Sequence, residues 1–536
     1  MIYGSSPSPQ ALLQTGFQAL QQGRVQEAWN AFHAVLRADP DNAIGHHMVG
    51  LIALQAGQLE TGVQSLTRSI ALDPSDPAAY GNLANGLRDL GRTDEALEAY
   101  AKALAMAPDF LNALNNRAVL FSRLGRFEEA LADYDRALAQ EGRAAALHNG
   151  RATALLALER HDEALASCEA ALRLDPASAD ARLSRASVLA QLGRYEAALA
   201  DYEACLAAKP GHPSALYYSG TASLALGDYA QGWARYEARK DLGGVRRTGP
   251  ESGFAQPAWT GETPLTGKTI LLHSEQGLGD TLQFCRYADL VKAQGATVIL
   301  QVETPLTGLL STLKGADVVL PKGAPLPDFD LHASLMSLPH AFRTRLETVP
   351  AEVPYLQAAP HKIAAWGQKL GPKTRPRVGL VWAGGFQSER TDLRTVYRRR
   401  DIPLAMLAPL AVAEVDFVSL QKGEPAQGEL AALVAAGWDG PALLDVAAGL
   451  YDFSDTAALI EALDLVITVD TAVAHLAGAL GKPVWILNRF DSCWRWLQGR
   501  TDSPWYPTAR LFRQTTFGDW APVVQDVVEA LGTFKA

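Results

Sequence analysis

Three short stretches of the sequence place polar side chains next to glycines or at the start of a helix, where chemistry can be done. The first is HSEQGLGDTLQF, residues 273–284, in which a strand runs into Gly277, Gly279 and Asp280. Glycine lets the backbone turn tightly or approach a ligand closely. An aspartate here either caps the next helix or acts as a general base that takes a proton from an attacking hydroxyl. The two roles are compatible, so Asp280 is the candidate catalytic residue.

The second stretch, LVITVDTAVAHLAGALGKPVW, reads as strand, turn, helix and second strand over residues 465–485. It delivers Asp470 and Thr471 to a helix start, where free backbone N–H groups and the helix dipole favour an anion. His475 lies four residues after Thr471 on the same helix face, within reach of a phosphate held by the turn. The alternative is an ordinary capped helix with a histidine in the core.

The third stretch, VWAGGFQSERTDLRTVYRRRDIPL, follows a strand with Gly384 and Gly385. Five arginines come next, in an otherwise acidic protein. Guanidinium groups suit phosphate because their donors meet its oxygens two at a time. A solvated helix face is the alternative for some of these arginines, which are Arg390, Arg394, Arg398, Arg399 and Arg400.

These stretches lie in a C-terminal half that alternates short β-branched runs with helical segments, which is typical of buried parallel strands with helices between them. Strands are expected at 269–273, 296–302, 316–320, 329–335, 377–384, 415–421, 463–470 and 483–488. They fall into two Rossmann-like groups, at residues 264–370 and 371–536. Ligands of such sheets sit at the carboxyl ends of the strands, so the cleft between the halves is the expected site.

The N-terminal half repeats itself every 34 residues. Glycines recur at 23, 57, 91, 125, 193 and 227, and alanines at 28, 96, 130, 164 and 198 keep the same period, five residues after the glycine position. An aromatic residue comes four positions after several of these alanines, as in Ala96 with Tyr100. A small residue lets two helices approach, and the aromatic ring fills the groove. The pattern predicts helix pairs that stack into a superhelix.

This period resembles the tetratricopeptide repeat, with about seven units in residues 9–240 and a linker at 241–263 that Phe254 and Trp259 partly anchor. Such a solenoid offers a concave surface for a peptide or protein, although a structural spacer or dimerisation arm is the alternative. Amides on first helices either grip an extended backbone or are merely solvated. They are Asn82, Asn85, Asn112, Asn115 and Asn116.

Composition sets broad limits on the chain. Its 536 residues indicate two or three domains. The net charge of -10 gives no general excess of basic residues that would bind the phosphates of a nucleic acid. No apolar run approaches the roughly 18 residues needed to cross a bilayer, and MIYGSSPSPQ lacks the regions of a signal peptide. We therefore expect a cytoplasmic protein. The four cysteines are widely spaced, which disfavours disulfides and a structural zinc site.

Two further groups of residues have an ordinary explanation. Asp328 and Asp330 form an Asp-x-Asp sequence of a kind that can bind a metal ion, but a solvated turn before a strand is favoured. Four aromatic residues near the C-terminus can stack on a base or sugar, and packing in the domain core is favoured instead. They are Trp494, Trp496, Trp505 and Tyr506.

Four segments of the C-terminal half together resemble the heptosyltransferase-like glycosyltransferase domain that bacteria fuse to tetratricopeptide repeats. The resemblance covers roughly residues 254–530 and rests on HSEQGLGD, VSLQKGE, VDTAVAHLAGALGKPVW and PWYPTARLFRQ. It implies that Gly279-Asp280 carries the base and that Asp470, Thr471 and His475 contact the donor nucleotide. It places Arg400 near the basic donor-phosphate position, whereas residues 387–399 have no clear match. The expected donor-binding residues are Gly277, Gly279, Gly384, Arg400, Asp470, Thr471 and His475.

The resemblance implies a GT-B architecture and an inverting, metal-independent glycosyltransferase that needs no cofactor besides its nucleotide-sugar donor. Among repeat-bearing families it is most similar to the flagellin glycosyltransferases of alphaproteobacteria. That similarity implies transfer of a sialic-acid-like nonulosonic acid from a CMP donor to Ser or Thr of flagellin held by the repeats, as part of bacterial motility. The alternatives are a lipid-linked or polysaccharide acceptor and a non-catalytic repeat scaffold.

Overall fold

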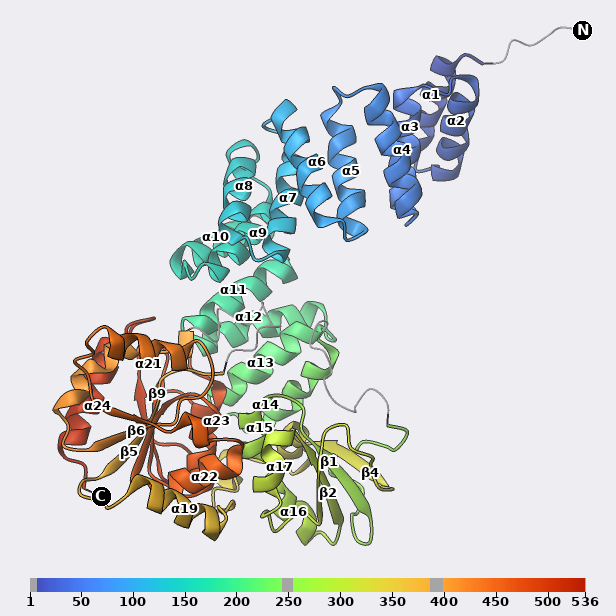
Figure 1. Cartoon of the computed structure of the whole chain (residues 1–536). Helices are drawn as coiled ribbons and strands as arrows, with labels where there is room; N and C mark the ends of the chain where they lie inside the picture. Colours follow the sequence, from blue (N-terminus) through green and yellow to red (C-terminus); the bar gives the residue numbers. More distant parts are fainter. Residues whose placement is uncertain (1–6, 243–253, 386–398, 536) are drawn as a thin grey trace, which may run out of the picture. The chain divides into compact units, whose positions relative to one another are not determined.

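The computed structural model describes residues 7–242, 254–385 and 399–535. The chain forms two compact units, residues 1–185 and 186–536 (Figure 1). The first consists of helices only, whereas the second contains the last repeats together with two parallel β-sheets. The predicted succession of helical repeats and an α/β region is confirmed.

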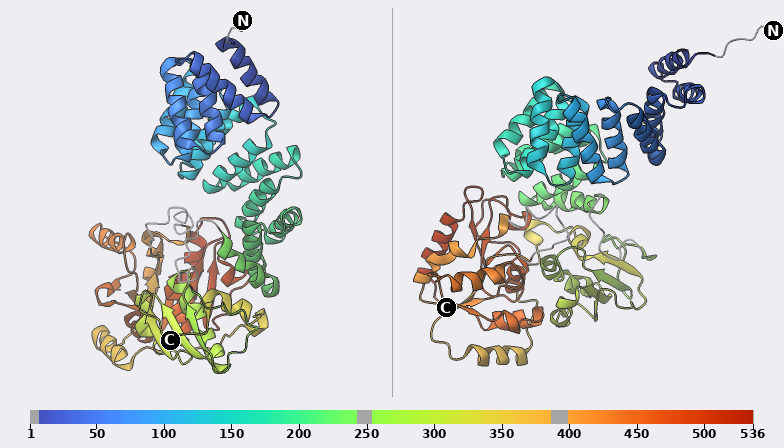
Figure 2. Two further views of the ribbon diagram at one scale, coloured as in Figure 1. Left: turned by 90° about the vertical axis from the view of Figure 1, so that its right-hand side faces the viewer. Right: turned by 45° about the horizontal axis from the view of Figure 1, so that its top comes forward.

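The repeats comprise fourteen helices that pack in consecutive pairs within the described residues (Figures 1 and 2). They are α1 (Pro9–Gln21), α2 (Val25–Ala38), α3 (Ala43–Gln55), α4 (Leu59–Leu72), α5 (Pro77–Asp89), α6 (Thr93–Met106), α7 (Leu111–Arg123), α8 (Phe127–Gln140), α9 (Ala145–Ala157), α10 (His161–Leu174), α11 (Ala179–Gln191), α12 (Tyr195–Ala208), α13 (Pro213–Ala225) and α14 (Tyr229–Tyr236). A 3₁₀ helix, η1 (Glu237–Asp241), follows.

The repeated glycines end the first helix of each pair in a left-handed turn, as shown by φ +76° at Gly91 and +73° at Gly125. Glycine suits such a turn because it has no Cβ to clash with the backbone. Glu159 occupies the one position of this glycine series that is not glycine, and it keeps the same conformation at φ +60°. The repeat geometry is therefore strong enough to hold a non-glycine residue in it.

The asparagines of the first helices form hydrogen bonds between successive repeats. Asn85 Oδ1 accepts from Asn116 Nδ2 at 3.0 Å and from the Tyr100 hydroxyl, and Asn82 Nδ2 lies 2.8 Å from His47 Nε2. Asn112 is exposed. Some of these amides thus stabilise the stacking of the repeats and are not simply solvated.

The strands of the second unit build two wholly parallel sheets. The first has the order β3-β2-β1-β4 and the second β10-β9-β8-β5-β6-β7. Read from β7, the second sheet has the doubly wound order 3-2-1-4-5-6, whose topological switch point lies between β5 and β8. The strands are β1 (Thr269–His273), β2 (Thr297–Val302), β3 (Val318–Pro321), β4 (Leu331–Ser334), β5 (Arg377–Val381), β6 (Asp416–Ser419), β7 (Leu443–Asp445), β8 (Leu465–Val469), β9 (Val484–Asn488) and β10 (Ala509–Arg513).

All eight predicted strands are present, and two more were missed. β7 has only three residues and is mostly exposed, and β10, at the other edge of the sheet, has arginine at two of its five positions. Neither shows the continuous apolar run that marks a buried parallel strand. Edge strands of this kind leave a weak signal in the sequence.

Helices cover both sheets (Figure 1). They are α15 (Leu278–Phe284), α16 (Tyr287–Ala293), α17 (Thr304–Leu310), α18 (Leu338–Ala341), α19 (Pro360–Leu370), α21 (Ala426–Ala435), α22 (Phe453–Glu461), α23 (Ala472–Ala479) and α24 (Ala521–Gly532). Short 3₁₀ helices are η3 (Leu335–Ser337), η4 (Leu346–Thr348), η6 (Leu404–Val412), η7 (Ala447–Gly449) and η8 (Trp494–Trp496).

The last repeat is part of the hydrophobic core of the α/β region. Trp233 of α14 packs edge-on against Trp494 and Phe284, with ring centroids 5.1 and 6.2 Å apart. Tyr229 accepts a hydrogen bond from the Trp505 indole at 3.1 Å. Because these rings are buried, the last helix pair cannot separate from the sheets without exposing them.

The described part of the predicted linker is anchored as expected. Trp259 is buried and donates its indole N–H to Thr263 O at 2.9 Å. Phe254 packs its ring against His332 of β4, and Ala258 forms an isolated bridge to the same histidine. Residues 254–263 thus form part of the first α/β half.

Within the described ranges, no helix combines the length and the apolar character that crossing a bilayer requires.

We predict that a chain starting at residue 177 folds, whereas one starting at residue 241 does not. The shorter chain lacks Tyr229, Trp233 and Tyr236, and removal of a buried aromatic side chain costs about 3–5 kcal/mol. Together these losses match or exceed a typical total stability of about 5–15 kcal/mol. Thermal melts followed by circular dichroism test this, and a cooperative transition of the shorter chain within a few degrees of the longer one would contradict it.

Candidate active site

Asp280 lies in the first turn of α15, which follows β1 after a loop of four residues. Its Oδ2 accepts a hydrogen bond from the Gly277 backbone N–H at 2.8 Å, so the predicted capping role is present. The side chain keeps 19% of its surface exposed. Each carboxylate oxygen can accept two hydrogen bonds, which leaves acceptor capacity for a substrate hydroxyl.

Arg495 pairs with Asp280 from the other half of the α/β region. Its Nη2 contacts Asp280 Oδ1, and its Nε donates to Gln283 Oε1 at 2.7 Å. Its Nη1 donates to Cys493 Sγ at 3.0 Å. Burial opposes the charge of this guanidinium, but Cys493 and Asp280 outweigh burial and raise the pKa of Arg495. The sequence gives no sign of this role, because Gln283 and Asp280 lie more than 200 residues from Arg495.

The start of α23 differs from that of α15 because no side chain caps it. Thr471 is the N-cap residue, yet its hydroxyl lies 3.0 Å from that of Thr468. Since the Thr468 hydroxyl donates to Val469 O, the Thr471 hydroxyl donates to Thr468, and it accepts no hydrogen bond from the backbone of the helix. Among the described residues, nothing accepts the backbone N–H groups of Ala472 and Val473. This helix start is therefore able to bind an anion.

Arg400, Gly384 and Asp470 meet at the topological switch point of the second sheet. Arg400 Nη1 lies 3.4 Å from the Asp470 carbonyl oxygen. A Cβ at Gly384 would come within 1.9 Å of Arg400 Nη2, so a side chain there would displace the guanidinium from this position. The Gly384 N–H donates to Asp401 Oδ1 at 2.8 Å. The structure thus brings together three residues predicted to bind the donor.

Arg399 points elsewhere. Its Nη1 lies 2.8 Å from Asp491 Oδ2 and 3.3 Å from Gln191 Oε1. It therefore helps to hold the end of α11 against the second sheet. Arg390, Arg394 and Arg398 lie outside the described residues.

His475 lies between the two helix starts. Its Nδ1 is 2.9 Å from the Tyr506 hydroxyl, and its ring stacks on Trp496 with centroids 5.5 Å apart. Burial, and then the charges of Arg495 and Arg286, lower the pKa of His475 well below its usual value. The structure thus favours a neutral ring that joins the two halves, although its Nε2 has no partner among the described residues.

Gly279 is required by the contact between α15 and α23. A Cβ at Gly279 would lie 2.9 Å from His475 Cδ2 and 3.4 Å from Ala472 Cα. Gly277, by contrast, has a φ of -78° that any residue adopts, and its nearest neighbour would be Asp280 Oδ2 at 3.4 Å. The predicted glycines therefore differ: Gly279 serves helix packing, and Gly277 is not constrained.

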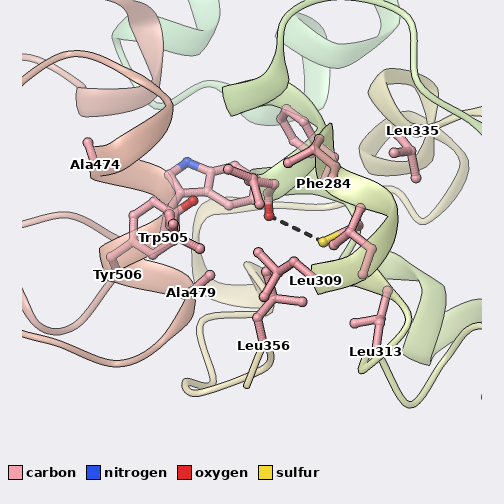
Figure 3. Close-up of a cluster of buried hydrophobic side chains, with 14 of the residues drawn as sticks. Phe284, Leu309, Leu313, Leu335, Leu356, Ala474, Ala479, Trp505 and Tyr506 are labelled. Atoms are coloured by element: carbon pink, nitrogen blue, oxygen red, sulfur yellow. Dashed lines mark hydrogen bonds between the residues drawn. The ribbon is translucent and has the colours of Figure 1, made fainter. Parts of the chain in front are cut away.

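The four C-terminal aromatic residues belong to the core, as favoured from the sequence. Figure 3 shows Trp505 and Tyr506 beside Ala474 and Ala479. Arg286 fixes this segment from the other half, since its Nη1 donates to Trp505 O at 2.8 Å. The aromatic residues thus hold the two halves together.

The Asp-x-Asp sequence also has a structural role. Asp330 Oδ2 accepts from the Thr269 N–H at 2.8 Å and its carboxylate pairs with Lys268, at the start of β1. Within the described ranges, no group of three or more His, Cys, Asp or Glu is arranged to hold a metal ion.

Two protein families match segments of the chain. Residues 18–77, 82–146, 120–179, 149–213 and 183–238 match the tetratricopeptide repeat model. Residues 417–487, which include Asp470, Thr471 and His475, match glycosyltransferase family 9 (heptosyltransferase). The chain is therefore similar to tetratricopeptide repeats in its N-terminal part and to glycosyltransferase family 9 over part of its second sheet.

Among curated proteins, Protein FlbA of Caulobacter vibrioides (strain ATCC 19089 / CIP 103742 / CB 15) is 32% identical over 303 residues. The match covers 52% of this chain and 48% of that protein, so the chain spans about half the length of this relative.

Solved structures similar to the chain include a tetratricopeptide repeat protein from Parabacteroides merdae, with 20% identity and a TM-score of 0.37. That match covers 44% of this chain and 93% of that chain. Another is YrrB, described as a TPR protein with an unusual peptide-binding site, with 22% identity and a TM-score of 0.32. It covers 35% of this chain and 96% of its own.

We predict that Gly279→Ala destabilises the protein by about 1–3 kcal/mol, the usual cost of overpacking a core. The added methyl would have to push His475 or α23 away. Gly277→Ala is the matched control and is expected to change stability by about 0.5 kcal/mol or less. Urea unfolding measures both variants, and equal midpoints would show that the two helix starts do not constrain each other.

Proposed function

We propose that this protein is a glycosyltransferase that moves a sugar from a nucleotide donor to a hydroxyl of a protein bound by its repeats. One observation carries the proposal: the start of α15, which bears a partly exposed aspartate, meets the uncapped start of α23. One helix start supplies a base and the other an anion site. A transferase needs both groups on opposite sides of one reacting carbon.

The proposed reaction is a single displacement. Asp280 takes the proton of the acceptor hydroxyl while the oxygen of that hydroxyl forms a bond to the anomeric carbon of the sugar. The bond from that carbon to the donor phosphate breaks, and its electron pair leaves with the phosphate. One displacement inverts the anomeric carbon, so we propose an inverting mechanism.

Negative charge that develops on the leaving phosphate requires stabilisation. The backbone N–H groups of Ala472 and Val473 and the guanidinium of Arg400 are the groups proposed to supply it. They lie at the switch point of a doubly wound sheet, where nucleotides commonly bind. Because these groups already provide positive charge, we propose that the reaction is metal-independent.

The finer parts of the proposal rest on the resemblance described above. They are the GT-B assignment of the two α/β halves, a CMP-linked nonulosonic acid as the donor, and flagellin as the acceptor. The repeats support a protein acceptor because solenoids of this kind present extended binding surfaces.

Calorimetric titration with CMP, UDP, GDP and ADP tests the proposal directly. Binding of one nucleotide, followed by transfer from the corresponding nucleotide sugar to a candidate protein such as flagellin, would support it. Transfer only to a lipid-linked or polysaccharide sugar would favour the second kind of acceptor. Failure to bind any of the four nucleotides would contradict a transferase.

We predict that Asp280→Asn lowers kcat by about 10²- to 10⁴-fold, the usual contribution of a general base. Donor affinity should remain unchanged because Asp280 does not contact the donor phosphate in this scheme. Asp330→Asn is the matched control, since Asp330 also accepts from a backbone N–H in the same half. If the Asp280 variant transfers sugar at close to the wild-type rate, Asp280 is not the base.

We also predict that Arg400→Gln raises the Kd for the nucleotide by tenfold or more. A hydrogen bond to a charged group contributes about 1.5–3 kcal/mol, and about 1.4 kcal/mol corresponds to tenfold. Arg510→Gln serves as the control because Arg510 lies on the exposed side of β10, stacked over Phe512. Calorimetry with unchanged affinity for the Arg400 variant would remove Arg400 from the donor site.

A further inference from the structure

The loop between β1 and α15, residues 274–277, sets the position of Asp280. Ser274 is held by the second strand, since its N–H donates to Gln301 O at 3.0 Å and its hydroxyl donates to Glu303 Oε1 at 2.9 Å. Gly277 is held by Asp280 itself. The two residues between them, Glu275 and Gln276, take their contacts largely from another part of the chain.

That part is the end of the last repeat. Arg239 of η1 makes a two-pronged contact with Glu275, with Nε 2.8 Å from Oε1 and Nη2 2.7 Å from Oε2. The Gln276 side chain donates to the Tyr236 hydroxyl at 3.3 Å. Half of the loop that leads to the proposed base is thus fixed by residues that belong to the helical repeats.

Arg239 is built firmly into this position. Only 3% of its surface is exposed, and its Nη1 also lies 2.6 Å from Glu237 Oε1. Ser334 and Ser337, on the first α/β half, donate to Glu275 and Glu237 respectively. A buried arginine with two carboxylates keeps its geometry because its donors lie in one rigid plane.

The charge state of the cluster agrees with this geometry. Burial opposes ionisation of Glu275, but Arg239 outweighs it and lowers the pKa of Glu275. The two glutamates in turn raise the pKa of Arg239 against the effect of burial. All three groups are therefore charged near neutral pH, and the cluster holds the loop through charge-assisted hydrogen bonds.

We propose that the last repeat contributes to catalysis. In this proposal Arg239 is a positioning residue, because it holds the loop 274–277 and thereby sets the position of Asp280. The inference rests on the proposed function of Asp280. It adds that the element ending the acceptor-binding repeats also sets the proposed base. A misplacement of about 1 Å at a reacting group costs up to about 100-fold in rate.

Loss of Arg239 alone would leave the mostly buried Glu275 carboxylate without its charged partner and would destabilise the fold. The informative variant is therefore Arg239→Met with Glu275→Gln, which removes both charges while Lys240 still pairs with Glu237. Its control is Arg117→Met with Asp133→Asn, which removes a comparable two-pronged pair, with contacts of 2.7 and 2.8 Å, from α7 and α8.

Three quantities are measured on the full chain: the urea midpoint, the Kd for the tightest-binding of CMP, UDP, GDP and ADP, and kcat with the corresponding nucleotide sugar. We expect the Arg239/Glu275 variant to keep the Kd and to lose about 10- to 100-fold in kcat. The control variant, Arg117→Met with Asp133→Asn, should keep both the Kd and the kcat of the wild type. A kcat within twofold of wild type for the Arg239/Glu275 variant would overturn the inference.

Arg239→Lys keeps the proposal testable if the double variant does not fold. Lysine retains the charge but not the planar fork, so a lowered kcat and faster amide hydrogen exchange in residues 274–284 are expected. Wild-type kcat and exchange for Arg239→Lys would also overturn the inference. If wild-type protein itself binds none of the four nucleotides, the proposed function fails instead, which is a different result.

Discussion

The site depends on the close approach of two helix starts. Gly279 at the beginning of α15 faces His475 and Ala472 at the beginning of α23, at distances that leave no room for a side chain. This contact joins the first sheet to the second and brings the carboxyl ends of β1 and β8 together. The helix start that bears a carboxylate thereby lies next to the one with free N–H groups, although 190 residues separate Asp280 from Asp470 in the sequence.

Three buried arginines stabilise this arrangement in a protein whose net charge is -10. Arg495 links the second half to Asp280, Arg286 binds the Trp505 carbonyl, and Arg239 links the last repeat to Glu275. Burying a guanidinium is unfavourable unless its donors are satisfied. Each of these contacts is therefore directional, and together they fix the relative positions of three segments that are distant in the sequence.

The fold was largely predictable from the sequence because its signals are local and repeated. The glycine turns and the apolar runs of the buried strands each depend on a few neighbouring residues, and the 34-residue period repeats such a pattern along the chain. β7 and β10 were missed because edge strands have one unpaired side and need no continuous apolar run. Inclusion of the last repeat in the α/β core was also not evident, since Trp233 resembles any aromatic residue of a repeat.

The site was predictable only in part. Asp280, Asp470 and Thr471 stand out because a strand delivers them to a helix start, and the structure places them there. Arg495 and Arg239 have no local signal, since each acts on a loop more than 30 residues away in the sequence. His475 has the spacing expected of a phosphate ligand, yet its burial and its Tyr506 partner are tertiary features that no spacing reveals.

Hydrogen exchange measured by mass spectrometry, with and without a saturating nucleotide, tests the central claim most directly. If the α23 start binds the donor phosphate, the amides of Ala472 and Val473 become protected on nucleotide binding, while peptides from residues 7–185 are unchanged. The Asp280 segment, residues 277–284, should show little change from the nucleotide alone. Bound nucleotide with no protection at residues 470–475 would place the donor elsewhere and contradict the account.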